Sequence, residues 1–193
     1  MHGFKQKVDR TVDFYSETPQ SQSARLLLTI AARDGLLVAA GDAEAAFLQA
    51  PLLEEVYVEP PPEAGEPRDV VYRALKALPG LRGSPVAWGA YATSVLTKTH
   101  KMEQSLVDPC LYHRPPCPKR GAHHLWALRH LDDFLFVGHA AKVRTLTMEM
   151  SKTLRLTDQT YLEQEGDTMR LLGCDITKVR RWGRSLIRRR GRS

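Results

Sequence analysis

The sequence predicts an α+β domain built on an antiparallel sheet with helices on one face. Three features predict it: an apolar helical pattern at 24–32 leading into a short apolar run at 36–41, two apolar runs meeting at an acidic pair within 128–138, and a helical pattern at 140–156. This order of helices, single strands and a hairpin favours hairpin-connected strands over a parallel sheet. With 193 residues, 42% of them hydrophobic, the chain can bury one core of moderate size.

The first helix and strand have clear boundaries. Ser21 or Ser23 can cap the helix at its start, and Gly35 can end it. The run from Leu36 to Asp42 is short and continuously apolar until its last residues, which favours a strand buried inside a sheet that helices cover.

The next segment is more polar and is rich in proline. An alternating pattern at 55–59 predicts a half-exposed strand, which the prolines at 60–62 end. A second strand is expected at 70–75. After the turn at 78–85, Ser84 can cap a helix that continues to about residue 100.

The second half is expected to complete the sheet. A strand is predicted at 110–113, two strands meet at the acidic pair within 128–138, and the helix at 140–156 carries apolar residues at helical spacing. Segments 161–163 and 169–176 are expected to be closing strands.

Two adjacent carboxylates, Asp132 and Asp133, lie where the two central strands meet. An isolated pair of this kind is most often structural, because Asp is a favoured turn residue. However, Asp42 ends another apolar strand far upstream. One single and one double acidic site on strands of one domain are typical of the ligands that hold paired magnesium ions in nucleotidyl transfer.

The basic charge is concentrated at the end of the chain. Residues 178–193 contain one Lys, seven Arg and no acidic residue, whereas the other 177 residues carry 20 basic and 22 acidic side chains. Such a tail suits sequence-independent contact with nucleic-acid phosphates; the alternatives are a solvated, disordered end and a fragment end that runs into unrelated sequence. Its candidate contact residues are Arg180, Arg181, Arg184, Arg188, Arg189 and Arg190.

Cysteine usage and hydropathy exclude several classes of protein. Three scattered cysteines do not form a disulfide framework. Cys117 lies close in sequence to His113, His123 and His124, but without a Cys-x-x-Cys pair a zinc site is disfavoured. No apolar run is long enough to span a membrane and no signal segment opens the chain, so we expect a soluble intracellular protein of unassigned compartment with no membrane partner.

Five sequence blocks resemble, in order, those of a known family. They are Gly41–Leu48 with its continuation at 53–61, then 76–88, then 105–111, then His130–Asp133, and finally Leu171–Ile176. Each block alone is a weak signal, but together they span roughly residues 3–178. In this order the chain resembles the reverse transcriptase domain of copia-type long-terminal-repeat retrotransposons.

The resemblance implies a polymerase palm with partial fingers over residues 1–177, followed by the basic tail at 178–193. It implies an RNA-directed DNA polymerase that adds deoxynucleotides to a primer 3′-hydroxyl, with two Mg²⁺ ions as cofactors and Mn²⁺ as the alternative metal. Its partners would be an RNA or DNA template–primer duplex and deoxynucleoside triphosphates. The ribonuclease H and integrase parts of a larger Pol polyprotein are expected outside this chain, as are most of the finger strands.

The resemblance also assigns roles to individual residues. The catalytic residues and metal ligands would be Asp42, Asp132 and Asp133. The nucleotide-binding residues would be Phe47, Arg82, Gly83 and Ser84, although Phe47 equally suits an ordinary core position. The primer-binding residues would be His130, Leu172 and Gly173.

The sequence departs from the family pattern at three places. His130 replaces the usual tyrosine beside the acidic pair, Gly83-Ser84 replaces the common Gln-Ala, and Pro79 stands where an aromatic residue is usual. Two alternatives therefore remain open at this point. One is a catalytically inactive, retrotransposon-derived nucleic-acid-binding remnant, and the other is a metal-dependent nuclease or related phosphotransferase.

Overall fold

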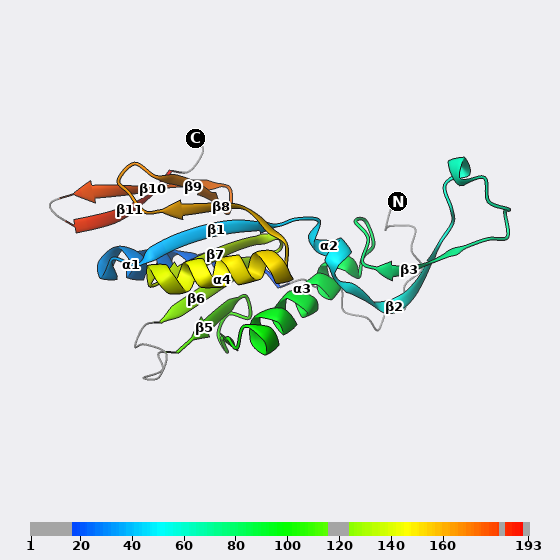
Figure 1. Cartoon of the computed structure of the whole chain (residues 1–193), viewed down its shortest axis with the longest axis horizontal. Coiled ribbons are helices and arrows are strands. Elements are labelled where there is room, and N and C mark those ends of the chain that lie inside the picture. The colour runs from blue at the N-terminus through cyan, green and yellow to red at the C-terminus, as the bar shows by residue number, and fades with distance from the viewer. Residues whose placement is uncertain (1–16, 116–123, 182–183, 191–193) are drawn as a thin grey trace. The chain divides into compact units, whose positions relative to one another are not determined.

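The computed structural model describes residues 17–115, 124–181 and 184–190, with side chains as far as residue 179. The described chain divides into two compact units, one comprising residues 45–92 and the other residues 17–44 and 93–190 (Figure 1). We call them the ribbon unit and the sheet unit. No helix in the described part of the chain is both long and apolar enough to cross a membrane.

The sheet unit is built on six strands, and every neighbouring pair of them is antiparallel. In spatial order they are β4 (Glu103–Gln104), β5 (Leu111–Arg114), β6 (Leu125–His130), β7 (Asp133–Gly138), β1 (Leu37–Ala43) and β8 (Leu156–Leu162). The predicted hairpin of β6 and β7 is therefore confirmed, and β1 lies directly beside it. A mixed α/β fold with antiparallel sheets is also confirmed.

The two long helices cover opposite faces of this sheet. Helix α1 (Ser21–Asp34) shares a core cluster with Val38 of β1, whereas α4 (Ala140–Thr153) contacts Tyr161 through the hydroxyl of Thr147. Tyr161 is paired with Ala39, which lies next to Val38 and so faces the other way. The prediction of helices on one face is therefore wrong, because β1 and β7 are buried on both faces and need cover on each.

A distant carboxylate caps the start of α1. Asp108 is buried and accepts hydrogen bonds from the backbone N–H of Gln20 at 3.0 Å and from the hydroxyl of Ser23 at 2.5 Å. The prediction that Ser21 or Ser23 caps the helix is therefore wrong: the N-cap position is Gln20, and the Ser23 hydroxyl donates to Asp108 instead of accepting from the helix backbone. Gly35 ends the helix in the left-handed conformation, as predicted.

A smaller sheet follows in the chain and consists of β9 (Thr168–Leu171), β10 (Cys174–Arg181) and β11 (Arg184–Arg190). Strand β11 pairs with β10 along its whole length and lies next to α1. The backbone of residues 184–190 is thus a strand, where the sequence predicts a disordered end.

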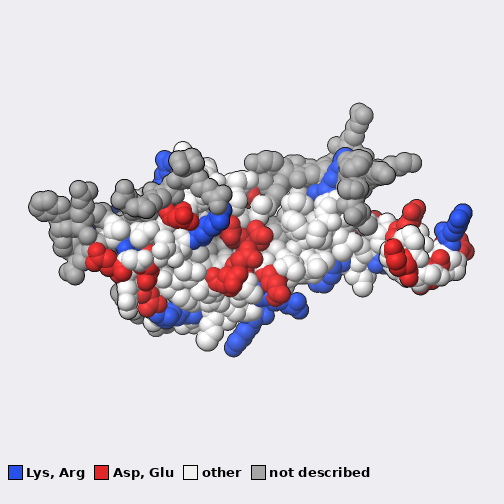
Figure 2. Space-filling model, turned by 90° about the horizontal axis from the view of Figure 1, so that it is seen from above, with Lys and Arg blue, Asp and Glu red and all other residues white. Residues whose placement is uncertain are grey.

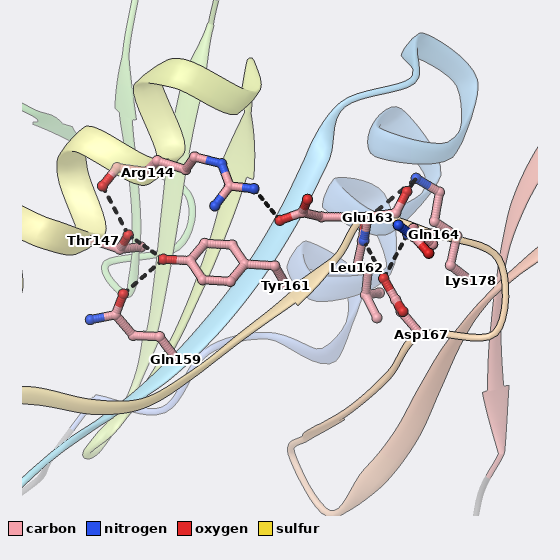
Figure 3. Close-up of polar contacts among 9 residues, drawn as sticks. All are labelled: Arg144, Thr147, Gln159, Tyr161, Leu162, Glu163, Gln164, Asp167 and Lys178. Atoms are coloured by element: carbon pink, nitrogen blue, oxygen red, sulfur yellow. Dashed lines mark hydrogen bonds and ion pairs between the residues drawn. The ribbon is translucent and has the colours of Figure 1, made fainter.

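Polar contacts join helix α4, strand β8 and strand β10 (Figure 3). The Arg144 guanidinium lies 5.0 Å from the ring centre of Tyr161 and also pairs with Glu163. The Lys178 ammonium donates to the backbone carbonyls of Glu163 at 2.9 Å and Leu162 at 3.4 Å. These contacts attach the smaller sheet to the edge strand of the central one.

The ribbon unit contains α2 (Ala46–Gln49), the antiparallel pair β2 (Pro51–Val58) and β3 (Tyr72–Lys76), the 3₁₀ turn η2 (Pro62–Ala64), and most of α3 (Ser84–Ser94). Helix α3 continues without a break into a π-helical turn, η3 (Val95–Thr99), in the sheet unit. The helix predicted from residue 84 to about residue 100 is therefore confirmed.

Candidate catalytic carboxylate site

The strand register brings the single and the paired acidic residues together. Asp42 on β1 lies directly opposite Asp133 on β7, which places both side chains on the same face of the sheet. Asp132 occupies the two-residue turn between β6 and β7, and its carbonyl accepts a hydrogen bond of 2.9 Å from the backbone N–H of Ala43. Three carboxylates that are distant in sequence thus meet at one end of the central sheet.

The hairpin turn that carries Asp132 is strained. Its first residue, Leu131, has φ 55, in the left-handed region that costs a non-glycine residue about 1–3 kcal/mol. Two features hold the turn in this conformation: the pairing of His130 with Asp133 and the hydrogen bond from Ala43. The tight turn keeps Asp132 next to Asp133.

The carboxylates disfavour each other's ionisation. Partial burial raises the pKa of Asp42, and the charges of Asp132, Asp133 and Asp158 raise it further. Burial and Asp132 likewise raise the pKa of Asp133, while His130 and Arg170 oppose that shift. Figure 2 shows acidic side chains grouped near the middle of one face, with basic side chains directly beside them.

Oxygen ligands of this kind suit Mg²⁺, and a bound cation would relieve their repulsion. In the described residues, however, no three acidic, histidine or cysteine side chains are close enough to hold one ion. The chemistry of the donor set therefore fits a divalent metal, whereas a closed coordination shell is not formed in this conformation.

Two of the predicted primer-binding residues lie in one cavity of the sheet unit. His130 and Leu172 both line a pocket of about 220 Å³ between the start of α1 and the β9–β10 turn. Gly173 follows Leu172 in that two-residue turn, where both residues have positive φ, as in a type I′ hairpin. The structure thus brings the end of β6 and the β9–β10 turn together.

The predicted nucleotide-binding residues belong to the ribbon unit. Phe47 lies in α2 and is half-buried, and Arg82 is exposed in the turn before α3. Gly83 lies just before that helix. Ser84 is buried as its first residue and donates its hydroxyl to the carbonyl of Leu78 at 2.6 Å, so it bonds back to the preceding turn.

Sequence reasoning missed two charged residues near the carboxylates. Asp158 lies at a bulge where the pairing of β8 with β1 shifts between Ala40 and Asp42, and its own φ is 48. Arg170 is exposed on β9. Neither residue stands in a motif, because their proximity depends on strand pairing that no local pattern encodes. Cys117 and His123, of the disfavoured zinc hypothesis, lie outside the described residues.

The chain is similar to two curated polyproteins from plants. It is 30% identical over 186 residues to a retrovirus-related Pol polyprotein from transposon TNT 1-94 of Nicotiana tabacum, a match that covers 92% of this chain and 13% of the relative. It is 29% identical over 169 residues to the corresponding polyprotein from transposon RE2 of Arabidopsis thaliana, covering 86% and 11%. The chain thus spans about an eighth of the length of these relatives. No solved structure matches it.

A family model described as reverse transcriptase (RNA-dependent DNA polymerase) matches residues 1–179. This match includes all three carboxylates and both turns of the site. Both curated relatives are copia-type Pol polyproteins. The chain therefore belongs to the reverse transcriptase family, and over most of its length it is similar to copia-type Pol polyproteins.

Proposed function

We propose that this domain catalyses RNA-directed DNA synthesis by two-metal nucleotidyl transfer, with the sheet unit as a polymerase palm and the ribbon unit as part of the fingers. The observation that carries the proposal is the register that sets Asp42 opposite Asp133, with Asp132 in the adjoining turn. Family membership supports the reaction class.

Asp42 and Asp132 would be the primary ligands of two Mg²⁺ ions, and Asp133 would complete the site. The bound metals would supply charge neutralisation at the primer 3′-hydroxyl and at the triphosphate. The protein's own contribution is positioning. The strained turn fixes Asp132, and the β1–β7 ladder fixes the separation of the other two carboxylates.

The resemblance assigns the remaining contacts to residues of both units. Phe47, Arg82, Gly83 and Ser84 would hold the incoming deoxynucleotide, with Phe47 restricting the space beside the sugar 2′ carbon. His130, Leu172 and Gly173 would contact the primer, since the structure gathers them around one pocket and one turn.

Primer extension tests the proposal. The chain is incubated with Mg²⁺, a DNA primer on an RNA template and deoxynucleotides, and is compared with Asp132→Asn. We expect the substitution to reduce incorporation by at least about 10²–10³-fold. Asp34→Asn, at an exposed ion pair with Arg33, is the matched control and should leave the rate unchanged.

Equal incorporation by the unmodified chain and Asp132→Asn would overturn the proposed catalytic site. Degradation of the strand when no deoxynucleotide is added would favour a nuclease instead. Addition of Mn²⁺ in place of Mg²⁺ tests the metal requirement under the same conditions.

A further inference from the structure

A bulge in the edge strand β8 lies directly beside one of the three carboxylates. In the β1–β8 ladder, Ala40 pairs with residue 160, whereas Asp42 pairs with residue 157. One residue of β1, Gly41, therefore faces two residues of β8, Asp158 and Gln159. Because of the extra residue, the side chains of β8 do not simply alternate between the two faces of the sheet at this point.

The two bulged residues have different surroundings. The amide oxygen of Gln159 accepts a hydrogen bond of 2.8 Å from the Tyr161 hydroxyl (Figure 3), and its amide nitrogen donates to the Ser151 hydroxyl on α4. Asp158 is exposed instead, and in the described part of the chain no hydrogen bond or ion pair involves its carboxylate. Gln159 thus holds β8 against α4, whereas the Asp158 side chain has no such structural contact.

The backbone of Asp158 explains part of the residue choice. Its φ is 48, in the left-handed region that Asp and Asn tolerate better than other non-glycine residues. Asn would therefore satisfy this backbone conformation as well as Asp does. The negative charge is the one property of Asp158 that the bulge itself does not require.

The charge of Asp158 acts on the carboxylate site. Burial raises the pKa of Asp42 most, and the charges of Asp132, Asp133 and Asp158 raise it further, so Asp158 is close enough to Asp42 for their charges to interact. In the described residues no three acidic, histidine or cysteine side chains are close enough to hold one ion, so Asp158 is not placed as a third ligand. An exposed carboxylate nearby can still attract a divalent cation through its electric field, and salt screens such an attraction.

We propose that Asp158 is an outer carboxylate of the metal site, which increases the affinity of the site for divalent cations by its charge and does not ligate the ion. The inference rests on the proposed function, because these cations are those of the proposed two-metal centre. It goes further by naming a residue that sets the Mg²⁺ concentration at which the site fills. Loss of this charge should therefore weaken metal binding and leave the reaction rate at saturating Mg²⁺ unchanged.

Asp158→Asn tests the proposal, since it removes the charge and keeps a residue that tolerates the left-handed backbone. Mn²⁺ binding is measured by electron paramagnetic resonance without nucleic acid or deoxynucleotides. The Kd should rise about three- to tenfold in low salt, and this difference should shrink in about 0.5 M KCl. The matched control is Asp34→Asn, which makes the same change in charge before the start of β1, whereas Asp42 lies near the end of that strand. Its Kd should equal that of the unmodified chain.

A Mg²⁺ titration of primer extension gives a second measurement. In Asp158→Asn the half-saturating Mg²⁺ concentration should rise by a factor similar to that of the Kd. The rate at saturating Mg²⁺ should stay within about twofold of the unmodified chain, because a residue that neither ligates the metal nor touches the substrate leaves the chemical step intact. The Mn²⁺ measurements decide by themselves if no extension is detected.

Three results would overturn the proposal: an unchanged Kd in Asp158→Asn, a loss of affinity that is as large in high salt as in low salt, or a clearly slower reaction at saturating Mg²⁺. Asp158→Gly removes the same charge without backbone strain, and it replaces the Asn variant if circular dichroism shows that variant to be unfolded. Asp132→Asn separates the two proposals. If it weakens Mn²⁺ binding while Asp158→Asn does not, only this inference fails; if neither variant weakens binding, the catalytic site itself fails.

Discussion

The central sheet and the β2–β3 strand pair both contain large apolar residues, but the sheet buries these side chains and the strand pair exposes many of them. In β7, five of six residues are buried, and Phe134 and Phe136 are fully inaccessible with rings stacked 6.0 Å apart. In the ribbon, Leu53 is 66% exposed and Leu75 is 74% exposed. The stability of the chain should therefore depend on the sheet that positions the carboxylates, and very little on the ribbon.

Truncation of a core phenylalanine should break the fold most severely. We expect Phe136→Ala to lower the free energy of unfolding by about 3–5 kcal/mol, because it removes a fully buried ring and leaves a cavity. Leu75→Ala, in the ribbon, should change it by less than about 0.5 kcal/mol. Urea denaturation followed by circular dichroism measures both values, and comparable losses would contradict the difference between the two regions.

A single hydroxyl at the α4–β8 contact should have an intermediate effect. The Tyr161 hydroxyl lies 2.8 Å from the hydroxyl of buried Thr147 and donates to the Gln159 amide oxygen at 2.8 Å (Figure 3). Tyr161→Phe should therefore cost about 1 kcal/mol of unfolding free energy. Tyr57→Phe on the exposed ribbon is the matched control, with no measurable change expected in the same denaturation experiment.

The smallest effect should come from relieving the repulsion between carboxylates. Because the pKa of Asp133 is raised in the folded chain, its ionised form disfavours folding at neutral pH. In EDTA at pH 7, Asp133→Asn should raise the Tm by about 1–2 °C. This gain should disappear as the pH falls through the raised pKa and below the ordinary Asp value, where the folded and unfolded chains are both protonated.

In Mg²⁺ the unmodified chain, and not Asp133→Asn, should have the higher Tm. The ion should raise the Tm of the unmodified chain more than that of Asp133→Asn, since binding to the folded state alone stabilises it. A variant that is less stable than the unmodified chain in EDTA would show that Asp133 has a stabilising partner instead. Differential scanning fluorimetry at several pH values is sufficient for both comparisons.

The elements with strong local patterns were predictable from sequence. The apolar run before Asp42 and the acidic hairpin at Asp132 gave the two strands of the site, because burial and turn chemistry act over a few residues. The left-handed turn at Leu172-Gly173 fell where the resemblance placed a primer-binding turn.

What sequence reasoning missed depends on partners that are distant in the chain. The alternation in β1 does not reveal which helix covers which face, since both faces are apolar. Asp108 gives no local sign that it caps a helix 85 residues upstream. The arginine run at 188–190 has the composition of a disordered tail, and only its pairing with β10 makes it a strand.

The carboxylate site forms only when β1 and β7 pair in the correct register. Asp42 and Asp133 are brought opposite each other by strands that lie 90 residues apart in the chain, and side chains on a strand alternate with a period of two. A slip of one residue would send one carboxylate to the far face of the sheet and would replace every native backbone pair of this ladder with a new one. A chain with this slip would keep its strand content by circular dichroism but would lack the pair of carboxylates, so the proposed activity requires correct registration of this one strand pair.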